Sequence, residues 1–275
     1  MRELSPGQVF FDYGPVSMVA SAIRNGEGDT ELCRSAFDII DGCLIELRPA
    51  LEVLRCYPGR VNPEALQGLP EIMARAVIHT GDPWLTPMAA VAGSIADAVA
   101  DHLRSQGAEK VTANNGGDIA IRLAPGQSLN MGVVYDLSRG TVDRSVRLTY
   151  ESGVGGVATS GLGGRSLTTG IASGVTVFSP RCAQADALAT LLADRSYIAS
   201  PAVHTVLAAE LDPDSDIADQ QVVVGVDSLT EEEREQALAQ VLAETELQYK
   251  KGGLLACIAT VQGKTVLFDP RGILS

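Results

Sequence analysis

Asp186 and Thr190 stand four residues apart in the alanine-rich segment 183–193. On a helix this spacing places the carboxylate and the hydroxyl on the same face. Completed by a backbone carbonyl and water molecules, such a pair suits a hard cation such as Mg²⁺. The competing interpretation is an ordinary solvated helix face, which the spacing alone favours.

A second candidate site is the turn over residues 114–118, with the sequence Asn-Asn-Gly-Gly-Asp. Asn115-Gly116 is a frequent two-residue hairpin turn, because both residue types accept a positive φ. A structural hairpin therefore accounts for Asn115, Gly116 and Gly117. Asp118 is the unexpected member, because the turn does not need its carboxylate, and it is a candidate ligand-binding residue.

The tract Ser152–Gly174 is dense in Gly, Ser and Thr. Backbone N–H groups around Thr159, Ser160 and Gly161 are candidates to hold phosphate groups. The tract matches neither the Walker A pattern nor a strand-linked G-x-G-x-x-G. A flexible surface loop is an equally good interpretation, since loops of this length in a domain are usually functional or mobile.

The three histidines, His79, His102 and His204, do not cluster in the sequence. His79, in a predicted loop over residues 79–83, is the one histidine that we carry as a candidate acid or base. No Ser/His/Asp or Cys/His arrangement can be defended. The five widely spaced cysteines are expected to be reduced, mostly buried thiols.

A central helix is expected to position these groups. Thr86 can cap its start, Pro87 suits its first turn, and Gly107 supplies its end. The small residues from Ala89 to Gly93 allow a ligand or another backbone segment to approach closely. Its polar face is expected to carry Ser94, Asp97, Asp101 and Arg104.

The other predicted elements alternate between hairpins and helices. Because strands are paired through hairpins and helices come between them, we predict an α+β fold with helices packed on mixed or antiparallel sheets. Strands are expected at residues 8–22 with a break at Gly14-Pro15, 111–113, 119–123, 174–179 and 221–226, hairpins at 124–150 and 254–268, and helices at 30–48, 70–76, 183–193 and 230–248.

The composition narrows the class of protein. The 275 residues are 45% hydrophobic and 20% charged, which is typical of a folded protein. A formal net charge of −13 argues against a nucleic-acid or anionic-membrane partner, because neutralising phosphates requires a basic patch. It leaves open a small anionic ligand held with a metal ion. No apolar segment approaches the ~20 residues needed to span a bilayer and no export leader is evident, so a cytoplasmic location is expected.

Four segments together resemble a known family. In order they are PMAAVAG at 87–93, NGGDI at 115–119, GVTV at 174–177 and ADALAT at 185–190. They resemble the UPF0280 proteins, which look like a branch of the ApbE superfamily of flavin transferases. The resemblance covers nearly the whole chain and implies a single ApbE-like domain over residues 1–275. A subdivision, if present, is expected near residues 124–150.

The resemblance also implies a chemistry. In ApbE flavin transferases Mg²⁺ assists cleavage of FAD, and FMN is joined to a Ser or Thr of a target protein. Asp186, Thr190 and the backbone carbonyl of Ala89 match the metal ligands, and Asp186 is the expected catalytic residue. By the same resemblance the flavin, FAD or FMN, would lie beside Thr159, Ser160 and Gly161, with Asn115, Gly116, Gly117 and Asp118 as the other wall.

The chain departs from the transferase pattern at three places. Thr86 replaces an aspartate, Ala92 replaces a charged residue, and residues 165–170 replace a His-Ile-Ile-Asp-Pro segment. An enzyme is therefore expected, either a transferase or a hydrolase of another small anionic metabolite in the same pocket. A non-catalytic flavin-binding or oligomeric partner protein is the third interpretation, and a homodimer is compatible with the resemblance.

Overall fold

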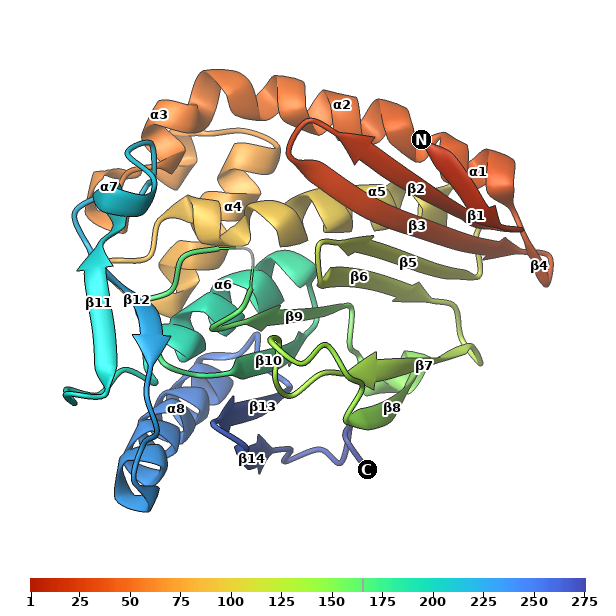
Figure 1. The fold of residues 1–275 in the computed structure, drawn as a ribbon. Helices are drawn as coiled ribbons and strands as arrows, with labels where there is room; N and C mark the ends of the chain where they lie inside the picture. Colours follow the sequence, from red (N-terminus) through yellow and green to blue (C-terminus); the bar gives the residue numbers. More distant parts are fainter. Residues whose placement is uncertain (165) are drawn as a thin grey trace.

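The computed structural model describes residues 1–164 and 166–275. Within them, one large sheet has ten strands, and every pairing along it is antiparallel. Its order is β1-β2-β3-β5-β6-β9-β10-β13-β14, with β4 beside β3 (Figure 1). The strands are β1 (Arg2–Ser5), β2 (Gln8–Tyr13), β3 (Val16–Arg24), β4 (Glu27–Gly28), β5 (Lys110–Asn115), β6 (Asp118–Leu123), β9 (Gly156–Ser160), β10 (Gly174–Ser179), β13 (Ala256–Val261) and β14 (Lys264–Phe268).

Two short sheets lie outside this path. One is the hairpin of β7 (Ser128–Val133) and β8 (Arg144–Thr149), and the other pairs β11 (Val203–Leu207) with β12 (Gln221–Val226). Val146 and Leu148 of the β7–β8 hairpin share a buried cluster with Phe178 of β10. Because successive strand residues point to opposite faces, this cluster and the main core lie on opposite faces of β10.

Helices cover the face of the ten-stranded sheet that lies opposite the β7–β8 hairpin, and they form two layers there. Helices α5 (Val91–Ser105) and α6 (Cys182–Asp194) pack on the middle strands, and α2 (Ala36–Leu47) and α4 (Leu69–Thr80) pack on them from outside (Figure 1). The remaining helices are α1 (Thr30–Arg34), α3 (Leu51–Leu54), α7 (Ala208–Leu211) and α8 (Glu231–Lys251), and the 3-10 turns are η1 (Arg48–Ala50), η2 (Pro58–Arg60), η3 (Pro63–Ala65), η4 (Pro87–Ala90) and η5 (Tyr150–Ser152). None of the helices in the described part is long and apolar enough to cross a membrane.

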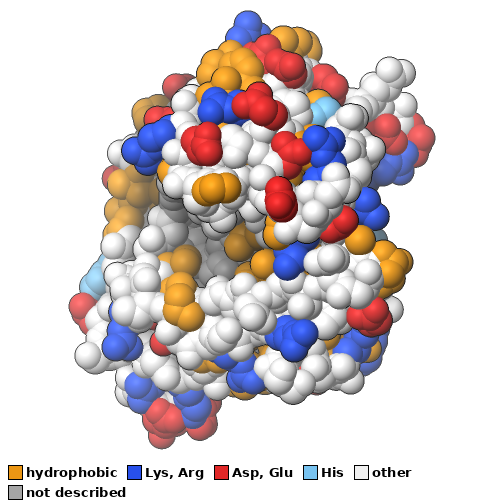
Figure 2. Space-filling view, turned by 90° about the vertical axis from the view of Figure 1, so that its right-hand side faces the viewer, with side chains coloured by type: hydrophobic (Ala, Val, Ile, Leu, Met, Phe, Trp, Pro, Cys, Tyr) orange, Lys and Arg blue, Asp and Glu red, His pale blue; other side chains and the backbone are white. Residues whose placement is uncertain are grey.

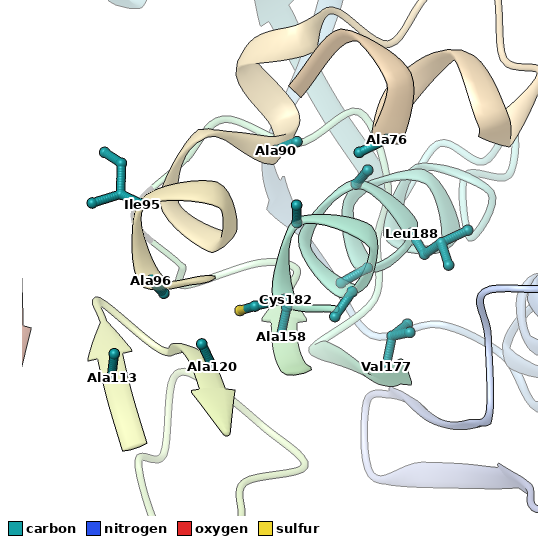
Figure 3. Close-up of a cluster of buried hydrophobic side chains, with 14 of the residues drawn as sticks. Ala76, Ala90, Ile95, Ala96, Ala113, Ala120, Ala158, Val177, Cys182 and Leu188 are labelled. Carbon is teal, nitrogen blue, oxygen red and sulfur yellow. The ribbon is translucent and has the colours of Figure 1, made fainter. Parts of the chain in front are cut away.

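Small side chains let α5, α6 and the sheet come close together. Alanines from both helices and from β5, β6 and β9 meet in the core (Figure 3). A Cβ atom added to Gly93 of α5 would lie 2.4 Å from the carbonyl oxygen of Cys182. One added to Gly156 of β9 would lie 2.3 Å from the backbone nitrogen of the same cysteine. Glycine at both positions is what allows the start of α6 to sit between α5 and β9.

A cluster of four charged side chains also holds the start of α6 against α5 and the sheet. The carboxylate of Asp97, 2% exposed, accepts from the Arg122 guanidinium at 2.6 Å and from the Ala183 N–H at 3.0 Å. Asp101 accepts from Arg122 and from Arg181. The cluster therefore ties α5 to β6 and to the first turn of α6.

The α+β prediction is confirmed, with the sheets in antiparallel form. The strands at 174–179 and 221–226 and the helix at 183–193 lie within a residue of their expected positions. The organisation as a single domain over residues 1–275 stays a prediction.

Several boundaries differ from expectation. The helix expected at 30–48 is broken between α1 and α2 at Ser35, and the helix at 70–76 continues to Thr80. His79 is therefore helical, because the chain leaves the helix only at Gly81 with φ of 78°. The prediction of a loop over residues 79–83 was wrong at its start.

The central helix also begins differently. Residues 87–90 form the 3-10 turn η4 before α5, and the side chain of Thr86 makes no capping hydrogen bond. Ser94 and Asp97, expected on the polar face, are 1% and 2% exposed. Asp97 is buried because it has Arg122 as its partner, and that partner is remote in sequence.

Candidate functional site

Two cavities meet beside the first turn of α5. The larger has a volume of about 640 Å³ and the smaller about 360 Å³, sizes usual for small-molecule sites. On the face shown in Figure 2 the surface is hollowed, with hydrophobic side chains at the edge of the hollow and charges of both signs around it. The residues that line both cavities are Met88, Val91, Ala92, Asp118 and Ser166.

The larger cavity has an apolar wall and a polar one. The apolar side chains include Leu44 and Ile45 of α2 and Val16 at the start of β3. The polar wall is formed by six of the seven residues predicted to bind the cofactor, namely Asn115, Gly116, Asp118, Thr159, Ser160 and Gly161. The cavity could therefore hold a flat apolar ring and hydrogen-bond its edge.

Gly117, the seventh, is not among the residues that line this cavity. Asn115 pairs directly with Asp118, so Gly116 and Gly117 are the two turn residues, with φ of 71° and 122°. The turn thus lies one residue later than the Asn115-Gly116 signal predicted, and the Gly117 N–H donates to the Asn114 side chain at 2.9 Å. Its role is to form the turn.

The shifted turn connects the hairpin to α5. Asn115, 6% exposed, donates from its amide to the backbone carbonyl of Ala92 at 3.2 Å. Asp118 pairs with Asn115 across the hairpin, so it also lies beside the first turn of α5. This contact is what brings Asp118 to the place where the two cavities meet.

Thr159 and Ser160 lie in β9, so the flexible-loop interpretation was wrong for them. The hydroxyls of Thr159 and Thr176 lie 2.9 Å apart, and both backbones are paired in the β9–β10 ladder. Gly161 follows with φ of 142°. These residues line the cavity from the end of a paired strand, a more rigid arrangement than a loop of free N–H groups.

The smaller cavity contains all three predicted metal ligands, Ala89, Asp186 and Thr190. Asp186 accepts a hydrogen bond from the Gly93 N–H at 2.8 Å, and the Thr190 hydroxyl donates to the Asp186 backbone carbonyl at 3.1 Å. Asp186 is half-buried against α5 and does not lie on a solvated helix face. A carboxylate, a hydroxyl and a backbone carbonyl in one cavity are the donor types that Mg²⁺ takes.

The pKa values of two carboxylates in this site are raised. Burial raises the pKa of Asp118 to about 7. Burial, and next the charge of Asp118, raise the pKa of Asp186 well above its ordinary value, against the backbone N–H groups of Gly93 and Ala92, which lower it. Two carboxylates that repel each other across a cavity are stabilised by a cation, so the residues present fit a divalent metal.

Further aspartates surround the smaller cavity. Asp194 accepts from the Thr169 N–H at 3.0 Å, and burial raises its pKa to about 6. Asp216 accepts from the Thr86 hydroxyl. Neither position was predicted from the sequence, and only Asp216 had a signal there, the run of aspartates at 212–216. The acidic residues that line the cavity are Asp118, Asp186, Asp194, Asp212, Asp214 and Asp216, and Arg55 is the basic residue among its described lining.

Other predicted features lie elsewhere. The ring of His79 hydrogen-bonds to the Gly252 carbonyl at 2.9 Å and lines neither cavity. The five cysteines are free, as expected. Of the divergent segment 165–170, Arg165 lies outside the described residues. Among the described residues no three His, Cys, Asp or Glu side chains form a metal-binding group.

The fold is that of the ApbE flavin transferases. The chain superposes on the apo flavinyl transferase ApbE of Pseudomonas stutzeri with a TM-score of 0.54, covering all of both chains at 14% identity. A likeness at this identity shows the fold alone. The family model described as AbpE bacteria matches residues 2–267, and the chain belongs to that family.

Sequence relatives confirm the resemblance to UPF0280 proteins. The chain is 33% identical to UPF0280 protein MK0206 of Methanopyrus kandleri over 172 residues, 60% of this chain and 67% of the relative. It is 31% identical to UPF0280 protein Mbar_A3697 of Methanosarcina barkeri, over 53% of this chain and 57% of the relative. The chain thus matches about two thirds or less of the length of these relatives.

Proposed function

We propose that this protein is a Mg²⁺-dependent enzyme that acts on a flavin nucleotide, in the manner of a FAD:protein FMN transferase. The observation that carries the proposal is the junction of the two cavities at Asp118. One cavity offers an apolar wall and hydroxyls for a ring system, and the other offers oxygen donors for a cation. A nucleotide that carries a ring and a pyrophosphate has both parts.

Each group has a distinct task in this proposal. Asp186, Thr190 and the Ala89 carbonyl would hold Mg²⁺, which when bound supplies positive charge to the pyrophosphate oxygens. Thr159 and Ser160 would orient the flavin from β9. In the reaction a phosphoanhydride bond of FAD breaks, AMP leaves, and the FMN phosphate joins a protein hydroxyl, which loses its proton.

The acidic lining supports the metal dependence. With six aspartates around the smaller cavity, an anionic pyrophosphate would be repelled unless a cation accompanied it. The fold of the flavin transferases and the family membership support the same proposal. The homodimer and the cytoplasmic location stay predictions.

Turnover of FAD by an Asp186→Ala variant tests the proposal. We expect the variant to lose Mg²⁺-dependent turnover while its thermal unfolding in EDTA matches that of the wild type. Retained turnover would remove Asp186 from the reaction. A thermal-shift panel with FAD, FMN and ADP, each with and without Mg²⁺, would show which ligand stabilises the native state.

A second candidate function is hydrolysis of another small metabolite in the same cavities. It is favoured by the Thr86–Asp216 contact, which places a further carboxylate, a candidate general base, at the smaller cavity. Turnover of a ring or amide substrate by a protein that does not bind FAD would select this function over flavin transfer.

A further inference from the structure

Asp118 is the one carboxylate that lines both cavities among the described residues. Neither of its carboxylate oxygens takes part in a hydrogen bond or ion pair within residues 1–164 and 166–275. By contrast, Asp186 accepts from the Gly93 N–H, Asp194 from Thr169 and Asp216 from Thr86. The Asp118 side chain is half-buried, and a carboxylate in such a position with no partner among the described residues points to a ligand that supplies one.

A short series of contacts places Asp118 beside Asp186. Asp118 pairs with Asn115, and the Asn115 amide donates to the Ala92 carbonyl at 3.2 Å. The next residue, Gly93, donates its N–H to Asp186 at 2.8 Å. The two carboxylates therefore approach the first turn of α5 from two sides, one from the sheet and one from α6.

We propose that Asp118 contacts the same cation as Asp186, so that the cation lies where the two cavities meet. This inference rests on the Mg²⁺ site of the proposed function and adds a second carboxylate to its ligands. Two carboxylates balance the charge of a divalent cation, and together with one hydroxyl, one carbonyl and water they form an all-oxygen ligand set.

The position defines the class of ligand. A cation held between Asp118 and Asp186 faces the larger cavity as well as the smaller one, because Asp118 lines both. A ligand seated in the larger cavity can then reach it directly. The site selects a molecule with a mostly apolar ring at one end and an anionic, metal-binding group next to it.

The experiment is calorimetric titration of Mg²⁺ alone into metal-free protein. We expect Asp118→Asn and Asp186→Asn each to weaken Mg²⁺ binding about tenfold or more. Asp214→Asn is the matched control, because it removes the same charge from an exposed carboxylate of the smaller cavity. That variant should bind Mg²⁺ within about twofold of the wild type, since exposed charges are screened.

A structural role for Asp118 predicts a different result. If Asp118 only supported the hairpin, Asp118→Asn would unfold at a lower temperature in EDTA and keep its Mg²⁺ affinity. We expect the reverse, with unfolding in EDTA unchanged or at a higher temperature because the repulsion from Asp186 is gone. Asp118→Ser, which also lacks the charge, gives the same test if the asparagine variant does not fold.

The outcomes separate this inference from the proposed function. Wild-type affinity in Asp118→Asn, with binding lost in Asp186→Asn, overturns the role of Asp118 and leaves the metal site of the proposed function standing. Equal weakening by Asp118→Asn and Asp214→Asn also overturns it, since the effect would then be general electrostatics. Absence of Mg²⁺ binding by the wild type overturns both.

Discussion

The carboxylate of Asp186 accepts a hydrogen bond at 2.8 Å from the backbone N–H of Gly93, in the first turn of α5. The N-terminal N–H groups of a helix lack partners within the helix and favour a negative charge. This hydrogen bond fixes the position of α6 along α5. As a result, Asp186 lines the same cavity as Ala89.

Replacing Gly93 with alanine tests that contact. The new methyl group would lie 2.4 Å from the Cys182 carbonyl oxygen and 2.8 Å from the Asp186 Cβ. We expect a loss of about 1–3 kcal/mol in the free energy of unfolding, together with weaker Mg²⁺ binding. Gly42→Ala is the control, because Gly42 is also helical and has open space at its Cβ. Equal effects in denaturant unfolding would contradict this account.

The elements beside the site were predictable where the local pattern is strong. The small-residue helix, the turn glycines and the segment at 183–193 follow from spacing and from residues that tolerate positive φ. The tract at 152–174 misled over residues 156–160, which form β9, whereas its described residues between β9 and β10 are in neither a helix nor a strand. Gly156 belongs to a strand that must pass within contact distance of Cys182, so it needs the absence of a side chain.

The burial and pairing of the charged residues in and beside the site were not predictable, because the partners of these residues are remote in the chain. Asp97 looked like a surface residue until Arg122 and the Ala183 N–H came beside it through the fold. Asp118 and Asp186 each appeared as separate candidates. Only the antiparallel register and the α5–α6 contact put the two carboxylates at the same cavity.

Removing the Arg122 side chain should lower the free energy of unfolding. This side chain is 13% exposed and pairs at 2.6 Å with Asp97, which is 2% exposed, so Arg122→Ala leaves this buried carboxylate only the Ala183 N–H and the more exposed Arg181, 3.4 Å away. We expect a loss of about 3–5 kcal/mol in the free energy of unfolding. Arg75→Ala is the control, since Arg75 is 49% exposed and should cost less than about 1 kcal/mol. Chemical denaturation that ranks the two variants equally would refute the structural role of the cluster.

The stability of the metal-free protein should depend on Asp194 in a defined pH window. Burial raises its folded-state pKa to about 6, from an ordinary value of 3.8. Between these values the folded state binds more protons than the unfolded state, so stability falls as pH rises from about 4 to about 6. The difference in unfolding free energy between the wild type and Asp194→Asn should follow that fall. A difference that stays constant across urea titrations in this range would exclude it.

Trp84 offers a direct optical signal. It is the single tryptophan of the chain, is 62% exposed and lines the smaller cavity. Addition of FAD with Mg²⁺ should therefore change its emission, and Trp84→Phe should remove the signal while calorimetry still detects binding. Unchanged emission on binding of FAD would place the ligand away from this cavity.

The most direct test of the proposed function is the affinity of the protein for FAD under three conditions. These are wild type with Mg²⁺, wild type with EDTA, and Asp186→Asn with Mg²⁺. We predict that wild type with Mg²⁺ binds FAD, and that binding is about tenfold weaker or worse in the other two. Equal affinity in all three, or no FAD binding by the wild type with Mg²⁺, would contradict a Mg²⁺-dependent flavin-nucleotide site.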